Sequence, residues 1–173
     1  FQSSQLVGLI GENGSGKTTL IKQGLFPELN KGFLGIAGRK WKSVTIRPGI
    51  TPLENLSAGI AQLGIEQTKA KLEDEVFLTE SMRLTSEGLK NECLKKFSQK
   101  SGFNALVVID NFEDLFQFRE VAPNVNEWDE TVKSFIQNIR KCASYSTIPV
   151  YFLIVLRAEY MSRLFEYRHF YEM

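Results

Sequence analysis

The sequence predicts an α/β fold in which a mostly parallel β-sheet lies between two layers of helices, a three-layer α/β/α arrangement. Short apolar segments alternate along the chain with longer segments whose apolar residues recur at helical spacing. The short segments are apolar almost without interruption, which is typical of parallel strands covered on both faces. A length of 173 residues suits one domain with a buried core, so we treat residues 1–173 as a single unit.

Four short apolar runs are predicted to be the strands of the sheet. The first apolar run stops at Gly11, and the second is β-branched and stops before Pro48 and Gly49. The third, "ALVVI", and the fourth, "VYFLIVL", are the most apolar. The predicted strands are 5–10, 43–47, 105–109 and 150–156.

The segments that connect these strands are predicted to be helices, because their apolar residues recur at helical spacing or their composition is rich in charge. The clearest pattern is Leu53, Leu56, Ile60 and Leu63, which share one helix face. The first helix is expected to bury Leu20, Ile21 and Leu25 together, and Asn126 is expected to cap the last helix. The predicted helices are 17–25, 51–63, 66–81 (charge-rich and exposed), 84–97 and 128–142.

Composition narrows the class of protein. A net charge of +1 gives no reason to expect nucleic acid or a membrane surface as partner, and the lysines at 90, 95, 96 and 100 are expected to form a solvated helix face. The longest apolar run, 148–156, is far below the roughly 20 residues that cross a bilayer. Cys93 and Cys142 lie in helical apolar patterns, so we expect buried, reduced thiols and a cytoplasmic location.

A glycine-rich stretch, "GENGSGKTTL" at 11–20, follows the first strand and opens the first helix. It fits the Walker A spacing Gly-x-x-x-x-Gly-Lys-Thr, in which glycines let successive N–H groups turn toward phosphate oxygens. Lys17 would reach the β- and γ-phosphates, and the Thr18 hydroxyl would ligate Mg²⁺. The expected phosphate-binding residues are Gly11, Glu12, Asn13, Gly14, Ser15, Gly16, Lys17, Thr18 and Thr19.

Acidic residues follow the third strand in "ALVVIDNFEDLF" at 105–116, a Walker B-like pattern. Asp110 would emerge at the carboxyl edge of the sheet, where ligands bind in such folds, and would hold Mg²⁺ through water. Glu113 is the expected catalytic base that orients the attacking water, with Asp114 as the alternative. The other reading of these acids is a helix start that the helix dipole favours.

Arg157 ends the fourth strand at the same edge and is expected to contact the γ-phosphate, which makes it the fourth catalytic candidate with Lys17, Asp110 and Glu113. The alternative is an ion pair with an acid such as Glu159. Arg47 could face the nucleotide or brace a turn, and these readings stay open. The lone histidine, His169, is expected to be structural or exposed.

Several stretches together resemble one family, the first novel-STAND group of P-loop NTPases, within the signal-transduction ATPases with numerous domains. They are the glycine loop, "KQGLFPEL" at 22–29, "RPGITP" at 47–52, "DNFEDLF" at 110–116 and "RAEY" at 157–160. The departures from the family pattern are Asn111, where Gln is common, and Asp114, where a second Glu is usual.

The resemblance implies a P-loop NTPase core with strand order 5-1-4-3-2, in a chain that is a fragment lacking the adenine-contacting segment and the fifth strand. It further implies an ATP-dependent switch with Mg²⁺, flanking effector and sensor domains, and possible homo-oligomers. Two alternatives stay open: a scaffold that binds ATP or ADP with little turnover, and an ABC-type ATPase. The ABC reading lacks a proper signature sequence, since "LSAGIAQ" at 56–62 is only an approximation of it.

Overall fold

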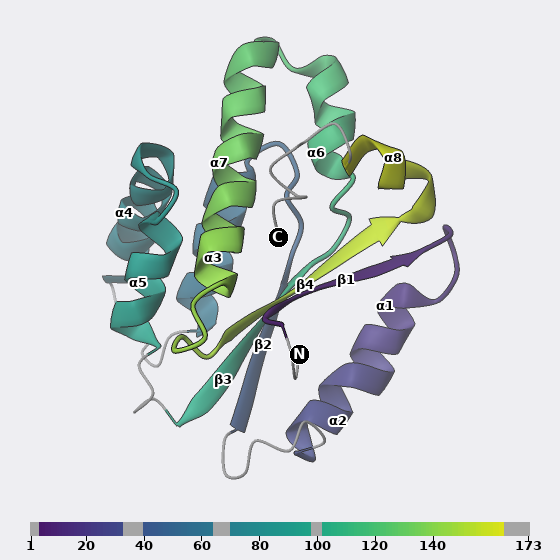
Figure 1. Ribbon diagram of the computed structural model, residues 1–173, viewed down its shortest axis with the longest axis vertical. Coiled ribbons are helices and arrows are strands. Elements are labelled where there is room, and N and C mark those ends of the chain that lie inside the picture. The colour runs from purple at the N-terminus through teal and green to yellow at the C-terminus, as the bar shows by residue number, and fades with distance from the viewer. Residues whose placement is uncertain (1–3, 33–39, 64–69, 98–101, 165–173) are drawn as a thin grey trace.

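The computed structural model describes residues 4–32, 40–63, 70–97 and 102–164 (Figure 1). Its strands form one parallel sheet in the order β1-β4-β3-β2. Both the α/β class and the parallel sheet are therefore confirmed, and the order of these strands agrees with the implied 5-1-4-3-2. The strands are β1 (Leu6–Gly11), β2 (Lys40–Ile46), β3 (Phe103–Ile109) and β4 (Val150–Arg157).

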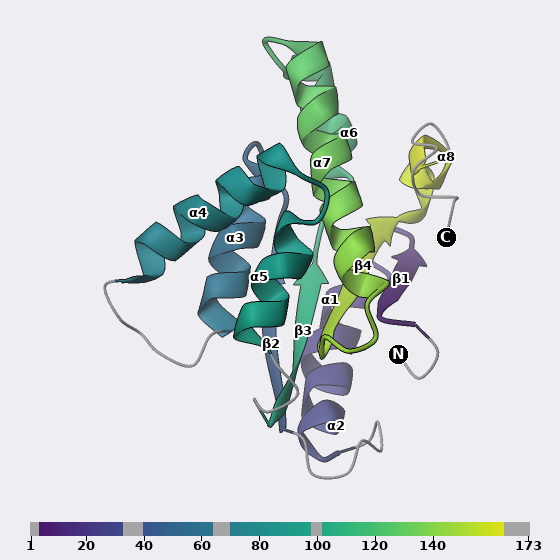
Figure 2. The ribbon, with the colours of Figure 1, turned by 60° about the vertical axis from the view of Figure 1, so that its left-hand side comes forward.

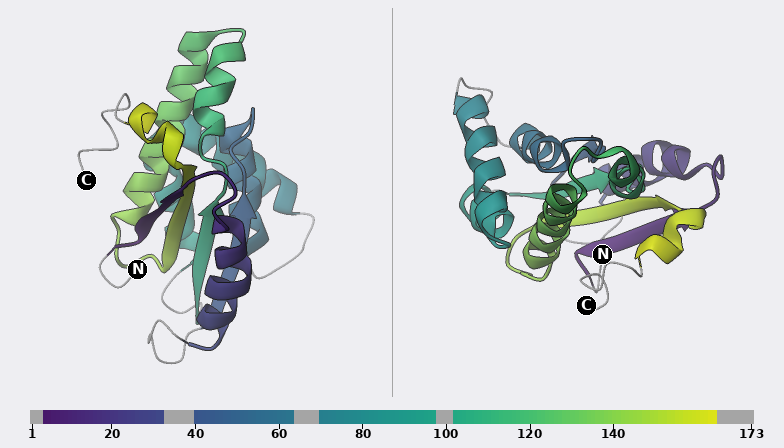
Figure 3. Two further views of the ribbon diagram at one scale, coloured as in Figure 1. Left: turned by 90° about the vertical axis from the view of Figure 1, so that its right-hand side faces the viewer. Right: turned by 90° about the horizontal axis from the view of Figure 1, so that it is seen from above.

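Helices cover both faces of the sheet, which gives the predicted three layers (Figures 1 and 3). On one face lie α3 (Pro52–Leu63), α4 (Ala70–Leu84), α5 (Gly88–Lys96) and α7 (Val125–Ala143), grouped together in Figure 2. The other face is covered by a continuous helical segment: α1 (Lys17–Thr19), a π-helical turn (Leu20–Leu25) and α2 (Phe26–Asn30). The described residues also form four short helical turns: α6 (Asp114–Gln117), a 3-10 turn (Phe118–Val121), a second 3-10 turn (Ala158–Tyr160) and α8 (Met161–Leu164).

The central strand β3 explains why the sheet needs two helical layers. All seven of its residues are buried. Val107 and Ile109 pack into the core shared with α3 and α7, whereas Leu106 and Val108 pack into the core shared with Ile21 of the opposite layer. Because successive side chains of a strand point to opposite faces, the apolar run at 105–109 is stable only between two covering layers.

Two predicted features of the helices are wrong in detail. Leu20 is 59% exposed while its neighbour Ile21 is buried, because adjacent residues of a helix point in different directions and here only Ile21 faces the sheet. The cap of α7 is Asn124 rather than Asn126: the Glu127 N–H donates to Asn124 Oδ1 over 3.3 Å, so the helix begins at Val125. An asparagine two residues earlier satisfies the first turn equally well.

The predicted helices 66–81 and 84–97 correspond to α4 and α5, with residues 64–69 outside the described part of the chain. The expected exposure of the first helix is wrong in part, because Leu78 is buried in the core and Thr79 is buried beside it. The first helix ends later and the second begins later than predicted, because the chain turns between them at 85–87 and α5 starts at Gly88. A Cβ at Gly88 would lie 2.4 Å from the backbone of Ser81, so this close approach requires glycine. From α7, Asn138 Nδ2 donates to the carbonyls of Met82 and Thr85 (both 3.1 Å), and its Oδ1 accepts from the Leu89 N–H (2.9 Å).

The remaining predictions concern isolated residues. Cys93 and Cys142 are buried free thiols, as expected; hydrogen bonding with Cys142, followed by burial, raises the pKa of Cys93 well above its ordinary value. The expected solvated lysine face is only partly present: the Lys95 side chain is exposed, whereas that of Lys90 is 11% exposed and pairs with Glu87. His169 and Lys100 lie outside the described residues. Among the helices that the structure describes, none has the length and apolar character needed to span a bilayer.

Candidate functional site

The carboxyl ends of the strands bring the candidate residues to one rim of the sheet. Gly11 at the end of β1 is in register with Arg157 at the end of β4. The N–H of Asp110, which follows β3, donates to the carbonyl of Ile46 at the end of β2 over 2.9 Å. Asp110 and the glycine loop therefore lie at the same edge, where ligands bind in open parallel sheets.

The glycine loop connects β1 to α1 by a backbone path that side chains would obstruct. Gly14 (φ 75°) and Gly16 (φ 84°) adopt left-handed conformations that favour glycine. At Gly11 a Cβ would lie 2.9 Å from Ser15 Oγ. Gly16 precedes α1, and no side chain caps this helix start. Because the first N–H groups of a helix lack partners within it, this helix start is suited to an anion.

Lys17 folds back over the loop. Its Nζ donates to the carbonyls of Gly11 and Glu12, both over 2.7 Å. These bonds orient the ammonium group at the loop, where it adds a full positive charge to the partial charge of the helix start. The loop residues from Glu12 to Gly16 are exposed, so an incoming anion meets little steric obstruction.

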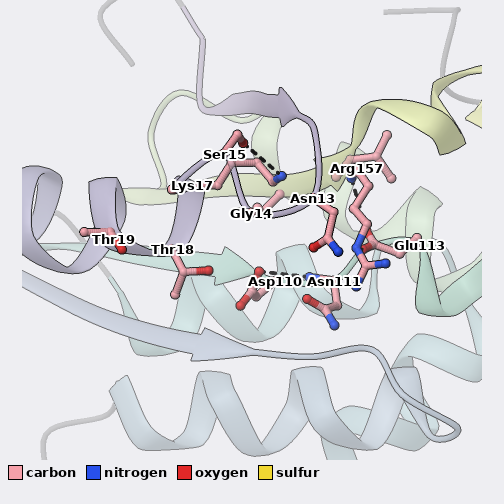
Figure 4. Close-up of a pocket in the computed structure, with 13 residues that line it drawn as sticks. Asn13, Gly14, Ser15, Lys17, Thr18, Thr19, Asp110, Asn111, Glu113 and Arg157 are labelled. Atoms are coloured by element: carbon pink, nitrogen blue, oxygen red, sulfur yellow. Dashed lines mark hydrogen bonds and ion pairs between the residues drawn. The ribbon is translucent and has the colours of Figure 1, made fainter.

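A cavity of about 300 Å³ lies beside the loop (Figure 4). The residues predicted to be catalytic all line this cavity: Lys17, Asp110, Glu113 and Arg157. Two predicted phosphate-binding residues, Gly11 and Glu12, do not line it and contribute only their carbonyls to Lys17. The full lining is Asn13, Gly14, Ser15, Gly16, Lys17, Thr18, Thr19, Asp110, Asn111, Glu113, Val155, Leu156 and Arg157.

The segment 110–114, which we call the acidic turn, is anchored firmly. Asp110 is 8% exposed, and its Oδ1 accepts from the Asn111 N–H over 3.1 Å. The Phe112 N–H donates to the Val155 carbonyl of β4 over 3.0 Å, and the Phe112 ring is fully buried. The Asp114 N–H donates to the Asn111 carbonyl over 2.9 Å. The turn that carries the acids is thus held by a backbone hydrogen bond to the sheet and by the burial of Phe112 in the core.

Glu113 and Arg157 contact each other directly (Figure 4). Glu113 Oε1 lies 2.9 Å from Arg157 Nε, and its Oε2 accepts from the Arg157 backbone N–H over 3.3 Å. The Glu113 side chain is only 2% exposed, whereas that of Arg157 is 34% exposed. The sequence alternative for Arg157, a pair with Glu159, is also present but longer at 3.8 Å. The sequence did not indicate that the two catalytic candidates would pair.

Asp114, the alternative base, faces away from the cavity lining and braces a neighbouring turn. Its Oδ2 accepts from the Gly49 N–H over 3.3 Å. Burial raises the pKa of Asp114 above its usual 3.8, and the nearby carboxylates of Glu113 and Asp110 add to the increase. The Gly49 bond and the charge of Arg47 act in the opposite direction. Arg47 is exposed and does not line the cavity, a position in keeping with the turn-bracing reading.

Sequence reasoning missed Asn111 as a lining residue. Its φ of 54° is in the left-handed region, which asparagine enters more readily than most residues. This conformation allows the chain to turn sharply from the end of β3 into α6. An asparagine directly after the terminal acid of a strand was the available signal, because Asn is common where the backbone must reverse direction.

The residues present fit a magnesium–nucleotide pair. Thr18 offers a hydroxyl and Asp110 a carboxylate at the same cavity. Within the described residues no group of three or more His, Cys, Asp or Glu could hold a metal ion. That is the usual situation for Mg²⁺, which is bound by one or two protein groups together with phosphate oxygens and water.

Comparisons with known proteins bear on the family and on the fold. The family model described as Novel STAND NTPase 1 matches residues 1–173. No curated protein matches the sequence significantly. A chain of the solved E. coli MS115-1 HORMA:CdnC:Trip13 complex has a similar fold, with a TM-score of 0.50 and 19% identity over 89% of this chain and 42% of that one. This chain thus spans less than half of that neighbour's length. Because the family match covers every residue, the chain belongs to the Novel STAND NTPase 1 family.

Proposed function

We propose that this domain binds ATP with Mg²⁺ and hydrolyses it to ADP, and that the exchange between the two nucleotides drives a signalling switch. The observation that carries the proposal is that Lys17, Thr18, Asp110, Glu113 and Arg157 line one and the same cavity of about 300 Å³. A loop that binds phosphates, a metal-binding acid and a second acid are the parts that phosphoryl transfer to water requires.

Each residue has a distinct role in this proposal. The amides at the start of α1 and the Lys17 ammonium bind the phosphates. Thr18 and Asp110 would hold Mg²⁺, which when bound neutralises charge on the β- and γ-phosphates. Glu113 accepts a proton from the attacking water, and Arg157 stabilises the charge that develops on the γ-phosphate.

The test is to measure MgATP binding and phosphate release by the purified chain. Glu113→Gln should bind ATP but lose turnover by about 100-fold or more, since general-base catalysis contributes that much. The matched control is Asp114→Asn, one position further along the same turn and outside the cavity lining, which should keep parental turnover. Parental turnover in Glu113→Gln would refute the assignment of the base.

A second function, a nucleotide-gated scaffold with little turnover, is favoured by one observation. Glu113 is buried and already paired with Arg157, so it is not free to accept a proton in this state. Retention of bound ADP with no phosphate release over hours would support the scaffold. In either case we propose that nucleotide state is transmitted to flanking effector and sensor domains or to a second copy of the chain.

A further inference from the structure

The pair formed by Glu113 and Arg157, which we call the latch, carries an inference about how the proposed site is regulated. One residue occupies both oxygens of the Glu113 carboxylate: the guanidinium lies at Oε1 (2.9 Å) and the backbone N–H at Oε2 (3.3 Å). With a side chain only 2% exposed, the carboxylate has little access to solvent. A general base must come within hydrogen-bond reach of the proton that it removes. The closed latch therefore keeps Glu113 from catalysis.

The two partners differ in how easily they can move. Glu113 belongs to the acidic turn, whose Phe112 is fully buried and whose backbone is bonded to β4. The Arg157 side chain is 34% exposed and also lies near the exposed Glu159, at 3.8 Å. A long arginine side chain at a strand end can change rotamer without moving the sheet. Opening the latch thus means movement of Arg157.

The γ-phosphate of a bound ATP would compete with Glu113 for the guanidinium of Arg157. Arg157 lines the same cavity as Lys17 and Thr18, so its guanidinium lies within the site where we propose the nucleotide binds. Guanidinium groups bind phosphate oxygens through paired, charge-assisted hydrogen bonds. Leaving Glu113 buried without its partner is costly, so only a strong competing anion can open the latch. ATP offers that anion beyond the β-phosphate, and ADP does not.

We propose that the Glu113–Arg157 latch is an autoinhibitory contact that the γ-phosphate opens, freeing Glu113 for catalysis and lowering the preference of the site for ATP over ADP. This inference rests on the proposed nucleotide-binding function. It predicts that Arg157 changes partner: the guanidinium contacts the Glu113 carboxylate before ATP binds and the γ-phosphate afterwards.

The test measures the affinities of the full chain for ADP and for a non-hydrolysable imido analogue of ATP, both with Mg²⁺. In Glu113→Gln the neutral amide no longer holds the guanidinium, so the affinity ratio of the ATP analogue to ADP should rise about tenfold. In Arg157→Ala and in the double variant the ratio should be equal, because the substitution at Glu113 acts only through Arg157. Glu159→Gln is the matched control, since it removes a longer and exposed contact of the same arginine, and its ratio should stay within about twofold of the parent's.

The outcomes separate this inference from the proposed function. Nucleotide binding with a ratio unchanged in Glu113→Gln overturns the latch and leaves the binding function intact. Absence of binding in the parent and in Glu113→Gln overturns both. Weak binding of the ATP analogue by the parent that becomes strong in Glu113→Gln supports both. Unfolding midpoints of the parent, Glu113→Gln, Arg157→Ala and the double variant without nucleotide give a second readout: non-additive changes support the pair, and additive changes count against it.

Discussion

The glycine loop and the acidic turn meet at one cavity, yet they are built in opposite ways. The loop from Glu12 to Gly16 is exposed, and the phosphate binding that we propose for it depends on backbone geometry. In the acidic turn, Asp110, Phe112 and Glu113 are buried, and the roles that we propose for its acids depend on which side chain each acid contacts. A backbone site depends on local residue types, whereas a side-chain site depends on partners that folding brings from elsewhere. The following predictions test this contrast, beginning with the largest expected effect.

Phe112→Ala should destabilise the protein by about 3–5 kcal/mol, because it removes a fully buried ring from beneath the acidic turn. The exposed loop residue Asn13 is the control, and Asn13→Ala should change the free energy of unfolding by less than about 0.5 kcal/mol. Urea unfolding measures both. Similar losses in the two variants would remove the distinction between an anchored turn and an exposed loop.

Lys17→Ala should weaken MgATP binding by about 10- to 100-fold, since a hydrogen bond to a charged group contributes about 1.5–3 kcal/mol. Titration calorimetry measures the change. Lys22→Ala is the control because Lys22 is an exposed lysine of the same helical segment and does not line the cavity. If both variants bind equally well, the ammonium of Lys17 has no special role.

Gly16→Ala should cost about 1–2 kcal/mol, because alanine at φ 84° meets intrinsic backbone strain. No atom lies within 4 Å of a Cβ built there, so steric contact adds nothing. Gly8→Ala is the control: it is also in open space but has no positive φ, and its unfolding midpoint should not fall. A parental midpoint for Gly16→Ala would show that the loop tolerates other backbone geometries.

Asp114→Asn should stabilise the protein by less than about 1 kcal/mol near neutral pH, since the group is partly solvated. The folded-state pKa of Asp114 is raised, so the protonated form is favoured in the fold and ionisation becomes destabilising as pH rises from about 3.8. The advantage of the uncharged variant should therefore disappear as pH falls below 3.8. Unfolding midpoints across that range measure it, and an advantage that grows at low pH would contradict the sign.

Sequence patterns predicted the fold and the members of the site better than the contacts within it. The strand at 105–109 and the loop at 11–19 were predictable because apolar runs and glycine spacing report local constraints. The contact between Glu113 and Arg157 joins residues 44 positions apart, and no local pattern encodes it. Asn124 was missed as a cap because two asparagines stand close together in the sequence, and residue type alone does not select between them. Leu20 was misassigned because a hydrophobic residue beside another one need not share its face.

The hydrogen bonds of Asn138 have a consequence for motion in the helical layer. From α7, the Asn138 amide donates to the Met82 carbonyl of α4 and to the Thr85 carbonyl just after that helix, and it accepts from the Leu89 N–H of α5. Because Asn138 is fully buried, separating α7 from α4 and α5 would leave the Leu89 N–H and the Met82 and Thr85 carbonyls without this partner in a dry environment. The amide protons of the three helices should then exchange with deuterium in one shared opening event, at a rate set by the least stable helix of the trio.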